Sequence, residues 1–250
     1  MDRQYRKFYH KRLILHTKTL LFKSVTSNCE SHTGEYISNI LIGAIDSVGH
    51  KKVCAVVTDN AANMKNAWKI LQEKYPYLII FGCLAHGINL LIKVILGIHG
   101  FDVILKDVKD IIKFFKNRQL PREMLKQNQI ENGGKPIALS LAVDTRWGSN
   151  AKMLESLLKC RNQIEAVTVN KDITKIMPTI LRRTILDVNF WFSVENIQQL
   201  LKVPSDVITN LEGDSANLSY VHDTLNQMEK DLRERVHFLE ESYQDQIMIF

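Results

Sequence analysis

Residues 53–64 read VCAVVTDNAANM, and this stretch decides the fold. Its first six residues form a short apolar, β-branched run that is typical of a strand buried on both faces of a parallel sheet. Asp59 stands at the carboxyl end of that strand. We therefore expect an α/β domain in which Asp59 lies at the edge of the sheet where ligands bind.

Further helices and strands are predicted on either side of this stretch. Residues 33–48 place apolar side chains every three or four positions, which indicates a helix packed on a sheet, and Gly49 ends it. A second helix ends before Pro76, residues 78–81 (LIIF) predict another buried strand, and residues 85–96 predict an apolar helix. Alternating strands and helices with short connections favour parallel strands joined by crossover helices.

Composition places the chain among globular proteins. It has 250 residues, of which 45% are hydrophobic and 24% charged, as in an ordinary folded domain. The longest apolar run, 88–98, is interrupted by Lys93 and is too short to span a membrane, so no membrane partner is expected. Four cysteines without a regular framework favour a reducing compartment, nuclear or cytoplasmic.

Charge is distributed unevenly along the chain. The net charge is +6, yet residues 1–25 hold seven Lys/Arg and one acid, whereas residues 203–250 hold three Lys/Arg and ten acids. This asymmetry predicts a surface that faces a polyanion and a separate acidic, helical end. A solvated surface with chance asymmetry is the alternative.

The second half of the chain is helical in pattern. Residues 102–117 predict a helix with apolar side chains on one face and four lysines on the other. These are Lys106, Lys109, Lys113 and Lys116. They would either contact phosphates or form a solvated ridge. Residues 149–167 predict a further helix, and we expect a domain of residues 1–160 followed by a helical region of residues 161–250.

Three small clusters could carry chemistry. Asp59 could be one oxygen ligand of a divalent cation, or it could cap the following helix. Cys83 and His86, in GCLAH, have a spacing found in zinc sites, but no second pair is present, so zinc is not expected and a packed, hydrogen-bonded element is favoured. Arg146 and Trp147 could hold a phosphate and stack on an unpaired base, or Trp147 could anchor the core.

Taken together, these motifs resemble the central region of hAT-superfamily transposases, the branch often found next to a BED-type zinc finger. The resemblance covers about residues 17–202 and rests on four ordered segments and one additional match. They are VTDNAANM (57–64), Tyr75-Pro76, GCLAHGINLL (82–91), DTRWGS (144–149) and SHTGEYI (31–37). It implies an α/β fold with an RNase H-like mixed sheet and flanking helices, followed here by part of an all-helical insertion.

The resemblance also implies roles for particular residues. Family members use three acids to hold two Mg²⁺ or Mn²⁺ ions for DNA cleavage and joining. Asp59 matches the second acid, and Asn60, Asn63, Cys83 and His86 lie in family motifs near the active site. Arg146 and Trp147 match the pair associated with the flanking hairpin or flipped base.

The acids that would complete this centre are not matched. The chain start offers only Asp2 in a different context, and no glutamate matches the third acid. We therefore expect a truncated, catalytically inactive, nuclear transposase-like protein that retains binding to hairpin-like or transposon-end DNA. The alternatives are a protein-interaction module that uses the helical carboxyl-terminal region, and a metal-dependent nuclease completed by a second chain.

Overall fold

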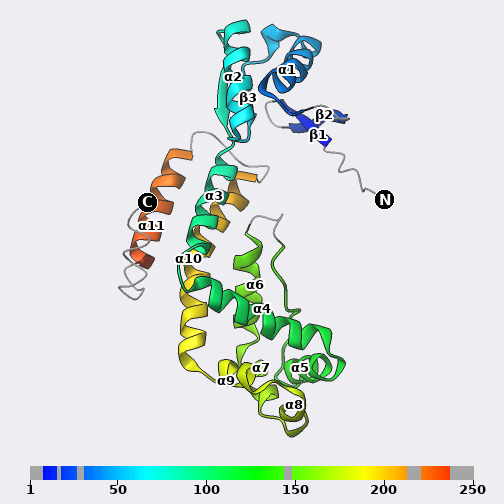
Figure 1. Cartoon of the computed structure of the whole chain (residues 1–250), viewed down its shortest axis with the longest axis vertical. Helices are drawn as coiled ribbons and strands as arrows, with labels where there is room; N and C mark the ends of the chain where they lie inside the picture. The colour runs from blue at the N-terminus through cyan, green and yellow to red at the C-terminus, as the bar shows by residue number, and fades with distance from the viewer. Residues whose placement is uncertain (1–7, 16–17, 27–30, 144–147, 213–220, 237–250) are drawn as a thin grey trace. The chain divides into compact units, whose positions relative to one another are not determined.

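The computed structural model describes residues 8–15, 18–26, 31–143, 148–212 and 221–236. Contacts divide the chain after Gly87 into an α/β unit and a helical unit that begins at Ile88 (Figure 1). This division does not coincide with the predicted boundary at residue 160. The helix formed by residues 101–117 packs against other helices of the second unit, and the sequence pattern alone does not reveal these long-range contacts.

The α/β unit begins with an antiparallel pair of strands. Strand β1 (Phe8–Leu15) pairs with β2 (Lys18–Thr26), and the register shifts between Lys11 and Arg12. Helix α1 (Gly34–Val48) follows. The Thr33 side chain caps α1 by accepting a hydrogen bond from the Tyr36 N–H at 3.2 Å, and Gly49 ends the helix with φ 96°.

A strand–helix–strand segment follows the 3₁₀ turn η1 (His50–Lys52). Strand β3 (Ala55–Thr58) and strand β4 (Ile79–Gly82) are parallel neighbours, and α2 (Ala62–Lys74) connects them. This arrangement confirms the predicted crossover of parallel strands. The core of the unit lies between these strands and α1 and α2. Its central cluster contains Ile45, Leu71, Tyr75 and Leu78.

The prediction that these strands are buried on both faces was wrong. Val56 and Ile80 pack against the core, but Val57 and Ile79 on the other face are 48% and 62% exposed. Among the described strands, β3 pairs only with β4 and β1 pairs only with β2. The mixed RNase H-like sheet is therefore not reproduced, because the hairpin and the parallel pair do not share a ladder.

A polar cluster joins the ends of α1 and α2. The Tyr75 hydroxyl donates to Asp46 Oδ1 at 2.6 Å, and Lys74 Nζ lies 3.4 Å from Asp46 Oδ2. The Tyr75 hydrogen bond holds the pKa of the Asp46 carboxyl below its ordinary value of 3.8, against the opposing effect of burial. The ionised Asp46 is thus favoured by the fold.

Tyr75→Phe should raise the pKa of Asp46 toward its ordinary value, as followed by a carboxyl NMR titration. A carboxyl whose pKa is lower in the folded state than in the unfolded state stabilises the fold above the unfolded pKa, about pH 4. This contribution is lost as the pH falls through the pKa of the folded state. The variant, which lacks the contribution, should therefore be less stable than the parent chain near neutral pH. The difference should shrink in acid. Tyr77→Phe is the control, since the Tyr77 hydroxyl bonds to His50 instead. An Asp46 pKa that is the same in the Tyr75→Phe variant as in the parent chain would show that the Tyr75 hydrogen bond does not lower it.

The helical unit contains nine helices in its described residues (Figure 1). They are α3 (Leu84–Leu96), α4 (Phe101–Asn117), α5 (Gln119–Glu131), α6 (Ser149–Lys159), α7 (Arg161–Thr168), α8 (Lys171–Ile176), α9 (Thr179–Ile185), α10 (Val188–Glu212) and α11 (Val221–Val236). Helix α3 begins in the α/β unit and continues into the helical unit. No described helix is by itself long and apolar enough to span a membrane.

The core of the helical unit forms where α4, α6 and α10 meet. Val108 and Ile111 of α4, Leu154 of α6 and Trp191 of α10 are fully buried. The helix predicted over 149–167 is divided at Cys160, which leaves the helical conformation between α6 and α7.

A buried polar contact fastens the segment after α5. The side chain of Gln129 accepts from the Ile137 N–H at 3.1 Å and donates to the Cys160 sulfur at 3.1 Å. Burial raises the pKa of the Cys160 thiol, so this cysteine is held as a neutral thiol. Gln129 thus ties the chain after α5 to the start of α7.

Candidate functional site

The carboxyl end of β3 places Asp59 at the edge of the parallel strands. Asp59 Oδ1 accepts a hydrogen bond from the Ala61 N–H at 3.1 Å, and Asp59 is exposed. This is an Asx turn, in which the carboxylate orders the backbone just before α2. Ala61, the residue that precedes α2, has no side-chain cap of its own. The structure therefore gives Asp59 a local role in starting α2.

Thr58 connects three segments at this edge. The Trp68 indole N–H donates to Thr58 Oγ1 at 2.8 Å, which joins α2 to the end of β3. The Cys83 N–H donates to the Thr58 carbonyl at 2.6 Å, which extends the β3–β4 ladder by one residue. Trp68 is half-buried, and its hydrogen bond fixes the residue just before Asp59.

Asn60 lies against β4 at the same edge. A Cβ added at Gly82 would lie 1.6 Å from Asn60 Oδ1, so only glycine leaves room for the Asn60 side chain. Asn63 Nδ2 donates to the His32 carbonyl at 2.9 Å and fixes the segment before α1. Asn60 and Asn63, which neighbour Asp59 in the sequence, thus make structural contacts with β4 and with the segment before α1 that their spacing alone did not predict.

Cys83 and His86 stand between β4 and the first turn of α3. Cys83 is half-buried with a free thiol, and His86 is half-buried and in contact with other groups. Within the described residues, no group of three or more His, Cys, Asp or Glu side chains is arranged to hold a metal ion.

A two-metal centre needs several carboxylates around two hard cations. At this edge Asp59 supplies one carboxylate, and one of its oxygens already accepts the Ala61 N–H. The described residues do not fit a pair of Mg²⁺ or Mn²⁺ ions, so we derive no metal-dependent step. The roles of Asp59, Cys83 and His86 in catalysis remain predictions.

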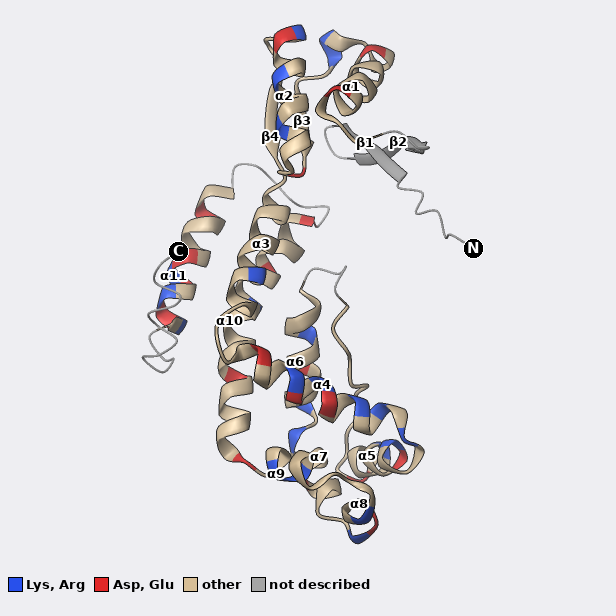
Figure 2. Cartoon of the chain, viewed as in Figure 1, with Lys and Arg blue, Asp and Glu red and all other residues tan. Residues whose placement is uncertain are grey.

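The four predicted lysines belong to α4, and their spacing of three or four residues places them on one side of the helix. Figure 2 shows basic and acidic segments along α4. Lys106, Lys113 and Lys116 are exposed and Lys109 is half-buried, whereas the opposite face of the helix is packed in the core. Lys113 lies 3.6 Å from Asp110. The other three ammonium groups have no carboxylate partner in the described part of the chain.

Acidic side chains interrupt this lysine ridge. Asp107 and Asp110 lie on α4 beside it, and burial together with the Asp110 charge raises the pKa of Asp107. Burial and Asp110 disfavour the charged form of Asp107, whereas the charge of Lys106 favours it. Arg118, at the end of α4, does not extend the ridge: its guanidinium donates to the Ile176 carbonyl at 3.2 Å and lies 4.9 Å from the centre of the Phe114 ring.

Arg146 and Trp147 lie outside the described residues, but the two flanks of their segment are joined. Ser149 Oγ accepts from the Val143 N–H at 3.1 Å and donates to the Val143 carbonyl at 2.9 Å. Gly148 enters α6 with φ 68°. These two hydrogen bonds hold Val143 and Ser149 together on either side of residues 144–147, a contact that the sequence pattern did not predict.

A cavity of about 330 Å³ begins at Gly148 and is lined by α6 and α10. Lys152 and Glu155 line it from α6, and Lys202 and Asp206 from α10. Lys202 pairs with Asp206, and Glu155 pairs with Lys159 at 2.6 Å. Ser205 also lines the cavity, and its buried hydroxyl has no hydrogen-bond partner among the residues that the structure describes. The mixed charge gives the cavity no clear preference for an anion or a cation.

Two families match the chain, and they overlap at α3 and α4. Residues 1–111 match the domain of unknown function DUF659, and residues 81–200 match the ZBED1 RNase-like helical domain. The first match covers the α/β unit, and the second covers the helical unit as far as the middle of α10. No curated protein matches the chain.

Proposed function

We propose that this hAT/ZBED-type transposase-derived protein, a relationship that its two family matches support, binds DNA through the lysine ridge of α4 and does not cut it. Arg146 and Trp147 would contact an unpaired or hairpin end, and a nuclear location would follow from DNA as the partner. The ridge is the single observation that carries the proposal.

The ridge suits a phosphate backbone because a rigid helix presents its charges at fixed spacing. Lys106 and Lys116 are ten residues apart, so the four ammonium groups are spread over about 15 Å of helix axis. Val108, Ile111 and Phe115 anchor the opposite face and are at most 1% exposed. Lysines on such a helix neutralise phosphates and release counterions without ordering a flexible loop.

Absence of cleavage is proposed from the surroundings of Asp59. Its carboxylate orders the turn before α2, and among the described residues it belongs to no group of three or more His, Cys, Asp or Glu side chains that could hold a metal ion. The test is incubation of supercoiled DNA with the purified chain and Mg²⁺ or Mn²⁺. Metal-dependent nicking that Asp59→Asn abolishes would overturn this part of the proposal and favour a nuclease completed by a second chain.

The test of DNA binding is a salt series in fluorescence anisotropy with hairpin-ended, blunt and single-stranded DNA. Changing Lys106, Lys109, Lys113 and Lys116 to glutamine should lower the slope of log K against log salt by about one for each lysine that contacts phosphate. The matched control changes Lys51, Lys52, Lys65 and Lys69 of the α/β unit, all exposed, and so removes the same charge. If both variants lost the same DNA affinity and the same salt slope, the ridge would contribute only its net charge and would not be the DNA-binding surface.

Two single variants refine the assignment. Asp107→Asn removes a carboxylate beside the ridge and should strengthen DNA binding severalfold, most clearly at low salt.

Trp147→Ala should weaken binding to hairpin or single-stranded ends more than to blunt duplexes, since base stacking contributes about 1–3 kcal/mol per base. Uniform weakening on all three DNAs would remove the stacking role of Trp147.

A further inference from the structure

Helix α10 has an apolar stripe that is covered at one end and open at the other. Phe192 and Val203 are eleven residues apart, about three helical turns, so they lie on the same side of α10. Val203 is 7% exposed, whereas Phe192 is 52% exposed. Val207, one turn beyond Val203, is 8% exposed, and Val188, one turn before Phe192, is 70% exposed.

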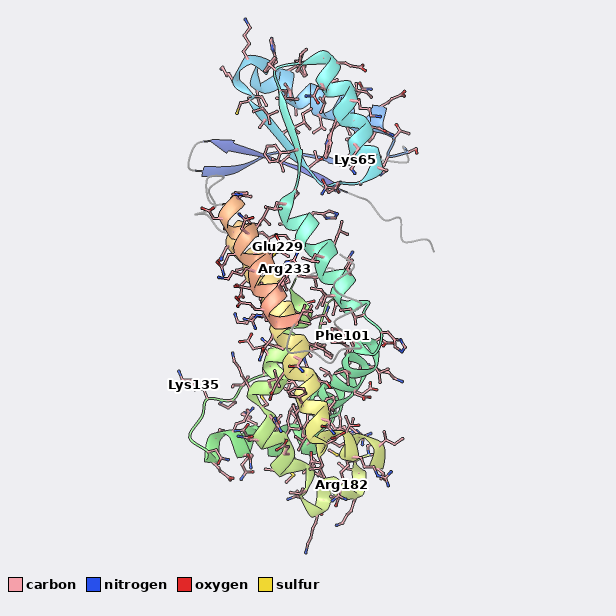
Figure 3. The ribbon with its side chains drawn as sticks, turned by 90° about the vertical axis from the view of Figure 1, so that its left-hand side faces the viewer. Lys65, Phe101, Lys135, Arg182, Glu229 and Arg233 are labelled. Atoms are coloured by element: carbon pink, nitrogen blue, oxygen red, sulfur yellow. The ribbon has the colours of Figure 1, made fainter. Side chains whose placement is uncertain are left out.

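The covered part of the stripe lies beside α11. Helix α11 packs on α10, along its carboxyl-terminal half, and runs in the opposite direction (Figures 1 and 3). It ends at Val236, which is 5% exposed. Its direction leads toward the amino-terminal half of α10, where the stripe is open.

We propose that residues 237–250 of this same chain cover the open half of the stripe, at Val188 and Phe192. Val203 and Val188 are separated by about 22 Å along the helix axis. Fourteen residues span about 21 Å as a helix and more when extended, so the segment is long enough. Its sequence, HFLEESYQDQIMIF, supplies the apolar side chains Phe238, Leu239, Ile247, Met248, Ile249 and Phe250.

Charge complementarity favours this segment over an arbitrary apolar partner. Residues 237–250 contain Glu240, Glu241 and Asp245 and no lysine or arginine. Near the open stripe, α9 presents Arg182 and Arg183, which are exposed and have no carboxylate partner among the described residues; Figure 3 labels Arg182 on α9.

The acids near the open stripe are already engaged. Asp187 accepts from the Asn189 N–H at 2.9 Å, and Glu195 pairs with Arg161 at 3.1 Å. The two α9 arginines are therefore the groups left to meet the carboxylates of residues 237–250.

The surface also extends past α10. Ile180 of α9 is 78% exposed and Leu186, between α9 and α10, is 45% exposed. Arg183 lies one turn from Ile180 on α9. The open surface therefore combines apolar side chains with adjacent guanidinium groups, which complements the apolar and acidic residues of 237–250.

The test is limited chymotrypsin digestion of the full chain, with cleavage after Phe238, Leu239 and Tyr243 quantified by mass spectrometry. Phe192→Asp should speed this cleavage about tenfold, because proteolysis follows the population of the open form. Val103→Asp is the matched control, since Val103 is 57% exposed on α4 of the same unit. Its cleavage rate should stay within about twofold of the parent chain.

Charge reversal provides a second, independent variant. Arg182→Glu with Arg183→Glu should also speed cleavage, and adding Glu240→Lys with Glu241→Lys should restore protection. Circular dichroism should be unchanged in each variant. Cleavage in the parent chain as fast as in the free peptide 237–250, or cleavage insensitive to Phe192→Asp, would overturn the proposal. Protection that increases with protein concentration would also overturn it, because it would place the contact between two copies.

Discussion

Replacing Trp191 with alanine is expected to lower the free energy of unfolding of the helical unit by about 3–5 kcal/mol. Trp191 is fully buried, and its indole N–H donates to the Ile185 carbonyl at 2.7 Å. Its ring packs edge-on against the Phe190 ring, with 5.3 Å between the ring centres. The Arg161 guanidinium lies 5.2 Å from the centre of the same ring. One side chain therefore links α9, α10 and α7, and its removal leaves both a cavity and an unpaired carbonyl.

Urea unfolding followed by circular dichroism measures this loss. Trp191→Phe separates its parts, because phenylalanine retains most of the ring volume but leaves the Ile185 carbonyl without its donor, a loss of about 1–3 kcal/mol. Leu120→Ala is the control, since Leu120 is 46% exposed on α5 and should change stability by less than about 1 kcal/mol. A Trp191→Ala protein as stable as the Leu120→Ala protein would show that α10 is not the centre of this core.

Gly34→Ala and Gly43→Ala, two identical changes in α1, should have opposite effects. A Cβ at Gly34 would lie 2.6 Å from Asn66 Cβ and 3.2 Å from two backbone atoms of α2, so α1 and α2 would have to separate. This overpacking should cost about 1–3 kcal/mol. A Cβ at Gly43 has nothing within 4 Å, and alanine there should stabilise the helix by about 0.4–1 kcal/mol.

Thermal unfolding of the two variants beside the parent chain tests this contrast, and each variant serves as the control for the other. A change of the same sign in both would show that helix propensity, and not the α1–α2 contact, governs stability at these positions. The contrast also bears on the candidate site, because Gly34 lies against Asn63 and Asn66 at the start of α2.

Local patterns predicted much of the secondary structure. Thr33 and Gly49 set the limits of α1, the apolar run before Asp59 gave β3, and the two stripes of α4 gave its lysine ridge and its buried face. Residues 127–131 (QNQIE) are polar, yet they continue α5 as far as Glu131. Polarity alone does not distinguish a helix from a loop: Gln127 and Glu131 are exposed on α5, whereas Gln129 is buried and hydrogen-bonded.

The candidate site depended more strongly on contacts between distant segments. The sequence placed Asp59 at a strand end but left open whether it holds a metal or orders the turn, and the structure shows the second contact with Ala61. The sequence did not predict that Asn60 fills the space above Gly82 or that Ser149 bridges to Val143.

By itself, the sequence determined the periodic features of this protein: the helix α1, the parallel pair β3 and β4, and the charged face of α4. Hydrophobic period and capping residues act over a few positions, so they can be read without the fold. Only the tertiary structure decided that the parallel pair keeps an exposed face, that the contacts divide after Gly87 and that α10 is half covered. Burial is decided by which segments meet, and segments as distant in the sequence as α4 and α10 pack together. No local pattern records that choice.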